Sequence, residues 1–218
     1  MVEDKTVLVP SRTRPKTDMV MVRRMLRLSL LAFAATLPAT FISDTRATAA
    51  IQDGKACEQF LPAISQSENV PLGVLYAVGM TESGNKGSLH PYALNVQGKS
   101  VITYSQNDAM HEFQKARRQG VKLIDLGCMQ VNFYYHGSNF PSVEAMLDPH
   151  TNILYAARLL KQLKESEGGW TAAVARYHAS PRKPAEQKLY VCTVIRNLVA
   201  TGFGAWTDES RNFCRYYR

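Results

Sequence analysis

The stretch NVPLGVLYAVGMTESGN, residues 69–85, decides the fold. Pro71 suits a helix start, because proline is favoured near the first helical position. Four residues then recur at helical spacing: Leu72, Leu75, Val78 and Glu82. Gly84-Asn85 is typical of a helix end. The spacing predicts a helix whose apolar stripe is extended, in its last turn, by a glutamate.

Further helices are predicted downstream of this one. Ser105 to Asp108 (SQND) are a candidate capping box for a helix that ends at Gly120. Asp148-Pro149 begins a long helix that Gly168-Gly169 closes, and two more helices are expected at roughly 171–179 and 186–200.

One segment has a different pattern. The runs YALNV and SVITY flank Gln97-Gly98-Lys99, which predicts a small β-hairpin within residues 92–104. Neither a repeat nor a low-complexity linker interrupts residues 51–218. Residues 50–218 are therefore expected to form one mainly α domain with a small β-hairpin insert.

Composition excludes several classes of protein. The chain has 218 residues, 45% hydrophobic and 20% charged, which are ordinary globular values and argue against a disordered chain. Half of the net charge of +8 lies in residues 1–49, which hold eight basic and four acidic residues. The net charge of +4 on residues 50–218 is too small to indicate a nucleic-acid binder. It suits loose attraction to an acidic polymer.

The N-terminus resembles an export signal. Arg23, Arg24 and Arg27 precede an apolar run, LSLLAFAATL, and residues 47–49 give an A-x-A cleavage site. This run is shorter than the ~20 residues that span a bilayer. We expect residues 1–49 to be a signal peptide and the protein to be periplasmic, with an uncleaved membrane anchor as the alternative.

Four cysteines remain after residue 49: Cys57, Cys128, Cys192 and Cys214. An even count in an exported chain suggests two disulfides, with three connectivities open. Our hypothesis pairs Cys57 with Cys128 and Cys192 with Cys214. The chain has no C-x-x-C pair and no H-E-x-x-H spacing, so we expect no metal.

Glu82 is the candidate catalytic residue. A carboxyl group on the apolar stripe, at the negative end of a helix dipole, should keep its proton to a higher pH than a free glutamate. A general acid near neutral pH needs that property. The alternative is a helix-end glutamate that turns to solvent or pairs with Lys86.

Four ordered motifs then resemble one family. They are TESG at 81–84, GCMQVN at 127–132, ARYH at 175–178 and EQKLYV at 186–191. Together they are similar to the motifs of the soluble lytic transglycosylases, whose domain is goose-lysozyme-like. The resemblance covers roughly residues 57–198. It implies a lysozyme-like fold and cleavage of the MurNAc–GlcNAc bond of peptidoglycan, which ends in a 1,6-anhydro ring.

The resemblance also implies roles for single residues. Glu82 matches the family's one catalytic acid/base, and Ser83 matches the serine that helps to place the N-acetyl group. The other matches are expected to contact the glycan: Met129, Gln130, Asn132, Tyr177, His178, Glu186 and Tyr190.

Three positions depart from the family pattern. His178 stands where the family usually has Asn, and Ser180 where it has Gly, which suggests a divergent subfamily with altered sugar contacts. Imidazole and amide groups can both donate and accept hydrogen bonds, so His178 keeps a groove role. Cys128 replaces the usual Leu and suits a loop held by a disulfide.

Two rivals stay open. A hydrolytic muramidase would need a second carboxylate at about 5–9.5 Å, and Asp125 is the nearest candidate by motif. An inactive peptidoglycan-binding part of a secretion or flagellar apparatus is the rival from another class. Five aromatic residues could stack on sugars: Tyr76, Tyr134, Tyr135, Tyr177 and Trp170. We expect a monomeric lytic transglycosylase without a cofactor, with a possible envelope-apparatus partner.

Overall fold

The computed structural model describes residues 55–217, so the predicted signal peptide lies outside the described residues. Within them the chain is mainly helical. The helical segments are η2 (Glu58–Phe60), α1 (Leu61–Glu68), α2 (Leu72–Glu82), α3 (Gln106–Arg118), α4 (Phe133–His136), η3 (Gly137–Asn139), α5 (Val143–Leu147), α6 (Pro149–Glu167), α7 (Trp170–His178), α8 (Pro184–Ala200) and α9 (Asp208–Phe213). None of the described helices is both long and apolar enough to cross a bilayer.

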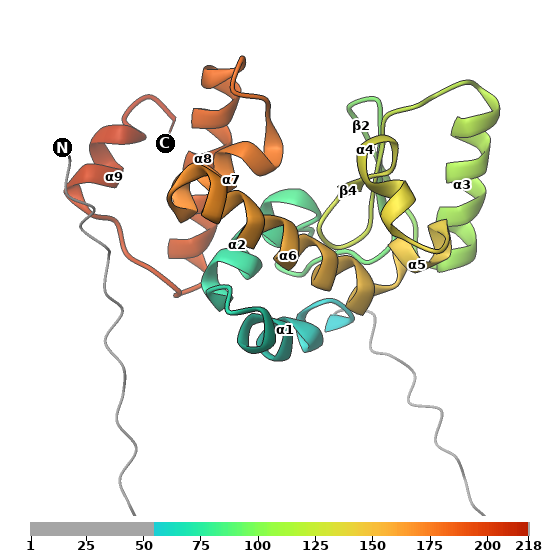
Figure 1. Cartoon of the computed structure of the whole chain (residues 1–218), viewed down its shortest axis with the longest axis horizontal. Coiled ribbons are helices and arrows are strands. Elements are labelled where there is room, and N and C mark those ends of the chain that lie inside the picture. The colour runs from blue at the N-terminus through green and yellow to red at the C-terminus, as the bar shows by residue number, and fades with distance from the viewer. Residues whose placement is uncertain (1–54, 218) are drawn as a thin grey trace, which may run out of the picture. The chain divides into compact units, whose positions relative to one another are not determined.

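Helix α2 is surrounded by other elements of the core. It packs against α1 and α8, and α6 packs against α1 and α7 (Figure 1). Leu75 and Val78 are fully buried on its apolar stripe, as predicted. A Cβ atom at Gly79 would lie 2.4 Å from Leu89, so glycine permits the close approach of the segment after α2.

A small antiparallel sheet lies beside α3, away from α7 and α8 (Figure 1). Its strands are β1 (Ala93–Val96), β2 (Lys99–Ile102), β3 (Ile124–Leu126) and β4 (Val131–Asn132), in the order β2-β1-β3-β4. The predicted hairpin is confirmed, with Val96 opposite Lys99. Gln97 and Gly98 both have positive φ, 52° and 85°, as the tightest hairpin turns require. The strands β3 and β4 were not predicted from the sequence.

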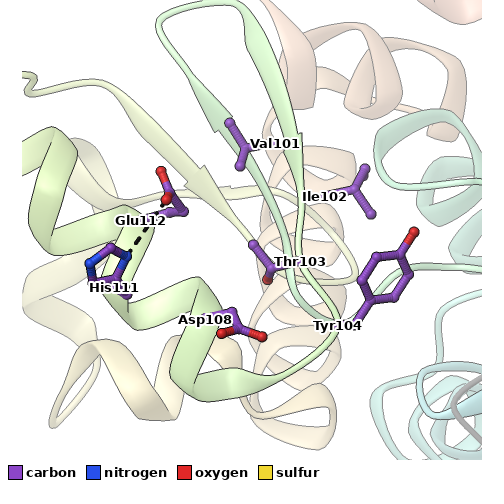
Figure 2. A pocket seen from close by; sticks show the side chains of 7 residues that line it. All are labelled: Val101, Ile102, Thr103, Tyr104, Asp108, His111 and Glu112. Carbon is purple, nitrogen blue, oxygen red and sulfur yellow. Dashed lines mark ion pairs between the residues drawn. The ribbon is translucent and has the colours of Figure 1, made fainter.

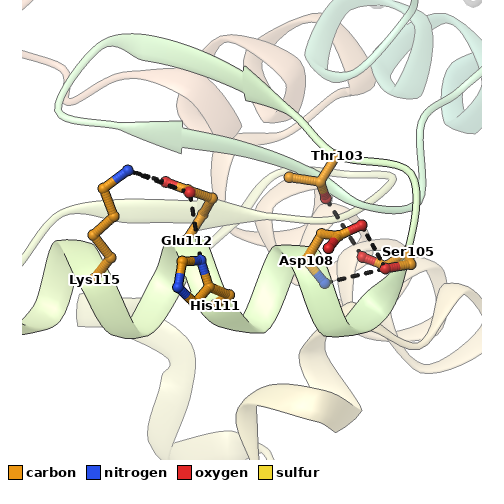
Figure 3. Close-up of polar contacts among 6 residues, drawn as sticks. All are labelled: Thr103, Ser105, Asp108, His111, Glu112 and Lys115. Atoms are coloured by element: carbon orange, nitrogen blue, oxygen red, sulfur yellow. Dashed lines mark hydrogen bonds and ion pairs between the residues drawn. The ribbon is translucent and has the colours of Figure 1, made fainter.

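The start of α3 differs from the predicted capping box. The Asp108 N–H donates to Ser105 Oγ at 3.1 Å, as expected for an N-cap. The Asp108 carboxylate, however, accepts a hydrogen bond from Ser105 Oγ at 2.7 Å (Figure 3). Because aspartate is one carbon shorter than the glutamate of a full capping box, its carboxylate binds the hydroxyl group in place of the backbone. A reciprocal box forms instead at Thr207 and Ser210, at the start of α9.

Both predicted disulfides are present. Cys57 is joined to Cys128 and Cys192 to Cys214. The first bond ties the residue before η2 to the turn between β3 and β4. The second ties the middle of α8 to the end of α9. Among the described cysteines none is free.

Candidate active site

Glu82 is the last residue of α2, and its side chain is half-buried. Tyr190, on α8, donates a hydrogen bond from its hydroxyl group to Glu82 Oε1 at 2.5 Å. Burial raises the pKa of Glu82 to about 8; the hydrogen bond from Tyr190 opposes this rise, and the negative charge of Asp125 adds to it. The carboxyl group is therefore mostly protonated at neutral pH, which is the state that a general acid needs.

Ser83 connects the end of α2 to the turn that carries Cys128. Its hydroxyl group donates to the Cys128 carbonyl at 2.6 Å and accepts from the His90 N–H at 3.1 Å. Ser83 is 6% exposed. Its Oγ atom also lies 3.5 Å from the Gly79 carbonyl, so Ser83 has three protein partners and fixes the backbone next to Glu82.

Asn152 also holds this turn, and its role was not predicted from the sequence. This residue of α6 is fully buried. It donates to the carbonyls of Leu126 and Met146 at 2.9 and 2.8 Å. It also accepts from the Met129 N–H at 2.8 Å. Gly127 has φ +80°, and a Cβ atom there would lie 2.8 Å from the Asn152 amide. A polar residue beside Ile153 on an apolar helix face was the signal available in the sequence.

Met129 and Gln130 act mainly inside this turn. Met129 is fully buried, so a glycan contact by this residue, which stays a prediction, would involve its backbone. Its carbonyl accepts a hydrogen bond from Tyr177 Oη at 2.7 Å. Gln130 is partly exposed, and its amide nitrogen donates to the carbonyls of Ala93 and Gly127, both at 2.9 Å. The glycan contact expected of Gln130 stays a prediction.

Asn132 and Asp125 form a polar pair across β3 and β4. Asn132 Nδ2 donates to Asp125 Oδ1 at 2.6 Å, and Asn132 Oδ1 caps α4. Burial raises the pKa of Asp125, against the effect of this hydrogen bond. Asp125 acts electrostatically on both Glu82 and Tyr177. It is therefore the second carboxyl group of the site.

Tyr177 and His178 end α7 next to this cluster. Burial, followed by the charges of Glu82 and Asp125, raises the pKa of Tyr177 well above its ordinary value, so the phenol stays neutral. The imidazole ring of His178 lies flat on the ring of Tyr190. The structure thus brings Tyr177, His178 and Tyr190 together around Glu82.

Glu186 lies apart from these residues. It is exposed in the first turn of α8 and forms an ion pair with Lys183 at 3.0 Å. No contact of Glu186 with Glu82 is present among the described residues, although its charge acts on His178. A glycan contact by Glu186 stays a prediction.

The aromatic side chains that could stack on sugars differ in their exposure to solvent. Tyr76 packs on Phe203, and Trp170 is partly buried against the core, whereas Tyr134 and Tyr135 are exposed. Tyr104 was not considered from the sequence, yet it is 75% exposed. Its ring contacts His90, whose N–H binds Ser83. Tyr104 is thereby connected to the residue next to Glu82.

A pocket of about 310 Å³ lies between β2 and α3. Figure 2 shows Val101 and Thr103 on the side of α3, and Ile102 and Tyr104 on the opposite side of the strand. Its acidic residues already have partners on α3 or at its start. Glu112 pairs with Lys115 and His111, and Asp108 pairs with Ser105 (Figure 3). Residues 55–217 hold no group of three His, Cys, Asp or Glu side chains in a metal-binding arrangement.

Residues 60–194 match the family described as the Transglycosylase SLT domain, and the chain belongs to that family. This match accounts for the lysozyme-like, mainly α fold, and it implies peptidoglycan lytic transglycosylase activity in general. No curated protein and no solved structure gives a significant match to the chain.

The shifted pKa of Glu82 predicts a pH-dependent stability. In the folded state this pKa is about 8, above its ordinary value of 4.5, so ionisation favours the unfolded chain. The free energy of unfolding is therefore highest below the pKa of Glu82 in the unfolded chain. It falls as the pH rises through the pKa of Glu82 in the folded state. After a discount for partial exposure, we expect Glu82→Gln to raise the free energy of unfolding by about 2 kcal/mol at pH ~8, but not at pH ~4. Chemical denaturation at both pH values measures this, and an equal effect at the two would contradict the shift.

Proposed function

We propose that this protein is a lytic transglycosylase that cleaves the MurNAc–GlcNAc β-1,4 bond and leaves a 1,6-anhydroMurNAc end, with Glu82 as its single acid/base. One observation carries the proposal: a half-buried carboxyl group, with its pKa raised to about 8, accepts a hydrogen bond from Tyr190. The group can therefore give up a proton near neutral pH and recover one in the same cycle. A protein that only binds the wall has no use for such a carboxyl group.

The first step breaks the glycosidic bond. Glu82 gives its proton to the oxygen that links the sugars, and this oxygen leaves with the GlcNAc unit. The carbonyl oxygen of the MurNAc N-acetyl group attacks the anomeric carbon as the bond breaks. The negative charge that appears on Glu82 is stabilised by the hydrogen bond from Tyr190.

The second step closes the ring and restores the acid. The C6 hydroxyl group of MurNAc attacks the anomeric carbon, the N-acetyl oxygen leaves it, and Glu82 takes the hydroxyl proton. Water is not consumed, so a second carboxylate is not required to activate it. Ser83, Gln130, Asn132, Tyr177 and His178 surround this chemistry in the proposal, and Met129 contributes through its backbone.

The presence of a second carboxyl group, that of Asp125, favours a second candidate function, that of a hydrolytic muramidase. Its charge acts on Glu82, as expected of a carboxyl group close enough to hold a water or to assist the cation. One of its oxygens, however, accepts a hydrogen bond from Asn132 at 2.6 Å, and its pKa is raised. We propose that Asp125 shapes the site without attacking.

Asp125→Asn separates these two candidates. A transglycosylase that works through Glu82 alone should keep cleavage within about tenfold, while the loss of a negative charge lowers the pKa of Glu82. A hydrolase that relies on Asp125 should lose about 10²-fold or more. Rates of release of soluble fragments from purified peptidoglycan, measured over a pH series, decide between the two.

We also propose that the protein acts in the periplasm as a monomer, after removal of residues 1–49. The apolar run with its A-x-A site and the paired cysteines support export. N-terminal sequencing of the exported protein tests this: a start at Ala50 is expected, and retention of Arg23 would contradict it. The wall itself is the expected partner.

A further inference from the structure

His178 and Tyr190 form a parallel ring pair next to Glu82. Their ring centroids are 4.3 Å apart, and the ring planes differ by 4°. Tyr190 is 5% exposed, whereas His178 is an exposed residue at the end of α7. The imidazole therefore covers one face of a phenol ring that is otherwise enclosed by the core.

The same phenol ring carries the hydroxyl group that binds Glu82. A hydrogen bond weakens steeply when donor and acceptor lose their alignment, so the tilt of the ring controls the bond to Oε1. Tyr190 is held at its backbone by α8, and His178 on α7 stacks on one face of its ring. Flat stacking restricts the tilt of this ring.

Charged and titratable groups from several elements act on the ring pair and on Glu82. Glu82 on α2 faces Tyr190 together with Tyr177 on α7, and Asp125 on β3 acts on Glu82. Glu186 and Lys183 act on His178 with opposite signs. Burial lowers the pKa of His178, which favours the neutral form of the stacked ring.

We propose that His178 is a positioning residue: by stacking on Tyr190 it keeps the tyrosine hydroxyl aimed at Glu82 and so sets the proton affinity of the acid. This inference rests on the proposed role of Glu82. The proposed role of His178 needs a flat aromatic ring. The Asn side chain that the family usually has at this position does not offer one.

The expected sign follows from the hydrogen bond. Donation from Tyr190 stabilises the ionised carboxylate, so its loss raises the pKa of Glu82 above about 8. Tyr190→Phe removes the hydrogen bond completely. It should raise the pKa of Glu82 by about one to two units, which is typical of one hydrogen bond to a charged group. His178→Ala should give at least about half of that rise, and His178→Phe, which retains a flat ring, should give much less.

The titration of Glu82 is measured directly by NMR of the folded full domain, with glutamate labelled at its carboxyl carbon. The Glu82 resonance is assigned as the one that Glu82→Gln removes. This readout needs no cleavage, so a failure of the proposed function would appear in peptidoglycan assays and not here. Thermal unfolding confirms that each variant is folded.

A double variant makes the test sharper. With Tyr190→Phe already present, His178→Ala should not raise the Glu82 pKa further, because the hydrogen bond through which His178 acts is gone. An unchanged Glu82 pKa in His178→Ala would overturn the proposal. Equal shifts in His178→Ala and His178→Phe would also overturn it, since the ring nitrogens and not the stack would then be responsible.

Discussion

Glu82→Gln should abolish cleavage of peptidoglycan, with a loss of at least the ~10²–10⁴-fold that is typical of a missing general acid. Glutamine keeps the size of the side chain and can accept the hydrogen bond from Tyr190, but it cannot transfer a proton. Asp125 is engaged by Asn132, so it is not expected to take over. Release of soluble fragments from purified peptidoglycan measures the loss.

Glu68→Gln is the matched control. Glu68 is also the last residue of its helix, α1, but it forms an ion pair with Arg158 at 3.0 Å, and the site does not include it. This variant should cleave at the wild-type rate. The Glu82→Gln protein should still sediment with insoluble peptidoglycan, because its fold and the other residues of the site are unchanged. Near-normal cleavage by folded Glu82→Gln protein would contradict the mechanism.

Removal of the Cys57–Cys128 disulfide should have the largest effect on stability. It joins residues 71 positions apart, so cross-linking restricts the unfolded chain strongly. The chain-entropy estimate is roughly 4 kcal/mol, against about 3 kcal/mol for the shorter loop closed by Cys192–Cys214. The double variant Cys57→Ser/Cys128→Ser should therefore unfold at a lower denaturant concentration than Cys192→Ser/Cys214→Ser.

The two disulfides should also differ in their effect on activity. The carbonyl of Cys128 accepts a hydrogen bond from Ser83, next to Glu82, whereas Cys214 is the C-cap that follows α9. Under conditions in which both double variants are folded, loss of the first bond should lower the cleavage rate more. The reverse order in stability would contradict the argument from loop length. The reverse order in cleavage rate would contradict the role given to the Cys128 turn.

Long, strongly periodic elements were predictable from the sequence. The positions of α2 and α6 follow from apolar spacing and from the proline and glycine residues at their ends, and α7 and α8 lie close to the ranges expected for them. The β3 and β4 strands span only three and two residues, too short for any periodicity. They are held by pairing with β1 and with each other, which depends on contacts distant in sequence.

The active site was predictable where the signal was local. Glu82 stands out because it extends an apolar stripe, and the structure places it beside Tyr190 from the last motif. The burial of Met129 was not predictable, because a methionine in a loop motif does not show whether it faces solvent or the core. Asn152 and the His178–Tyr190 stack depend on packing between separate helices, which spacing along the chain does not record.

The mass of the products tests the central claim most directly. Purified peptidoglycan is digested with the wild-type protein, and the soluble fragments are analysed by mass spectrometry without prior reduction. If Glu82 alone closes the 1,6-anhydro ring, the new MurNAc ends should be lighter than reducing ends by one water and should resist borohydride reduction. Fragments that carry the added water and are reduced by borohydride would show a hydrolase and contradict the account.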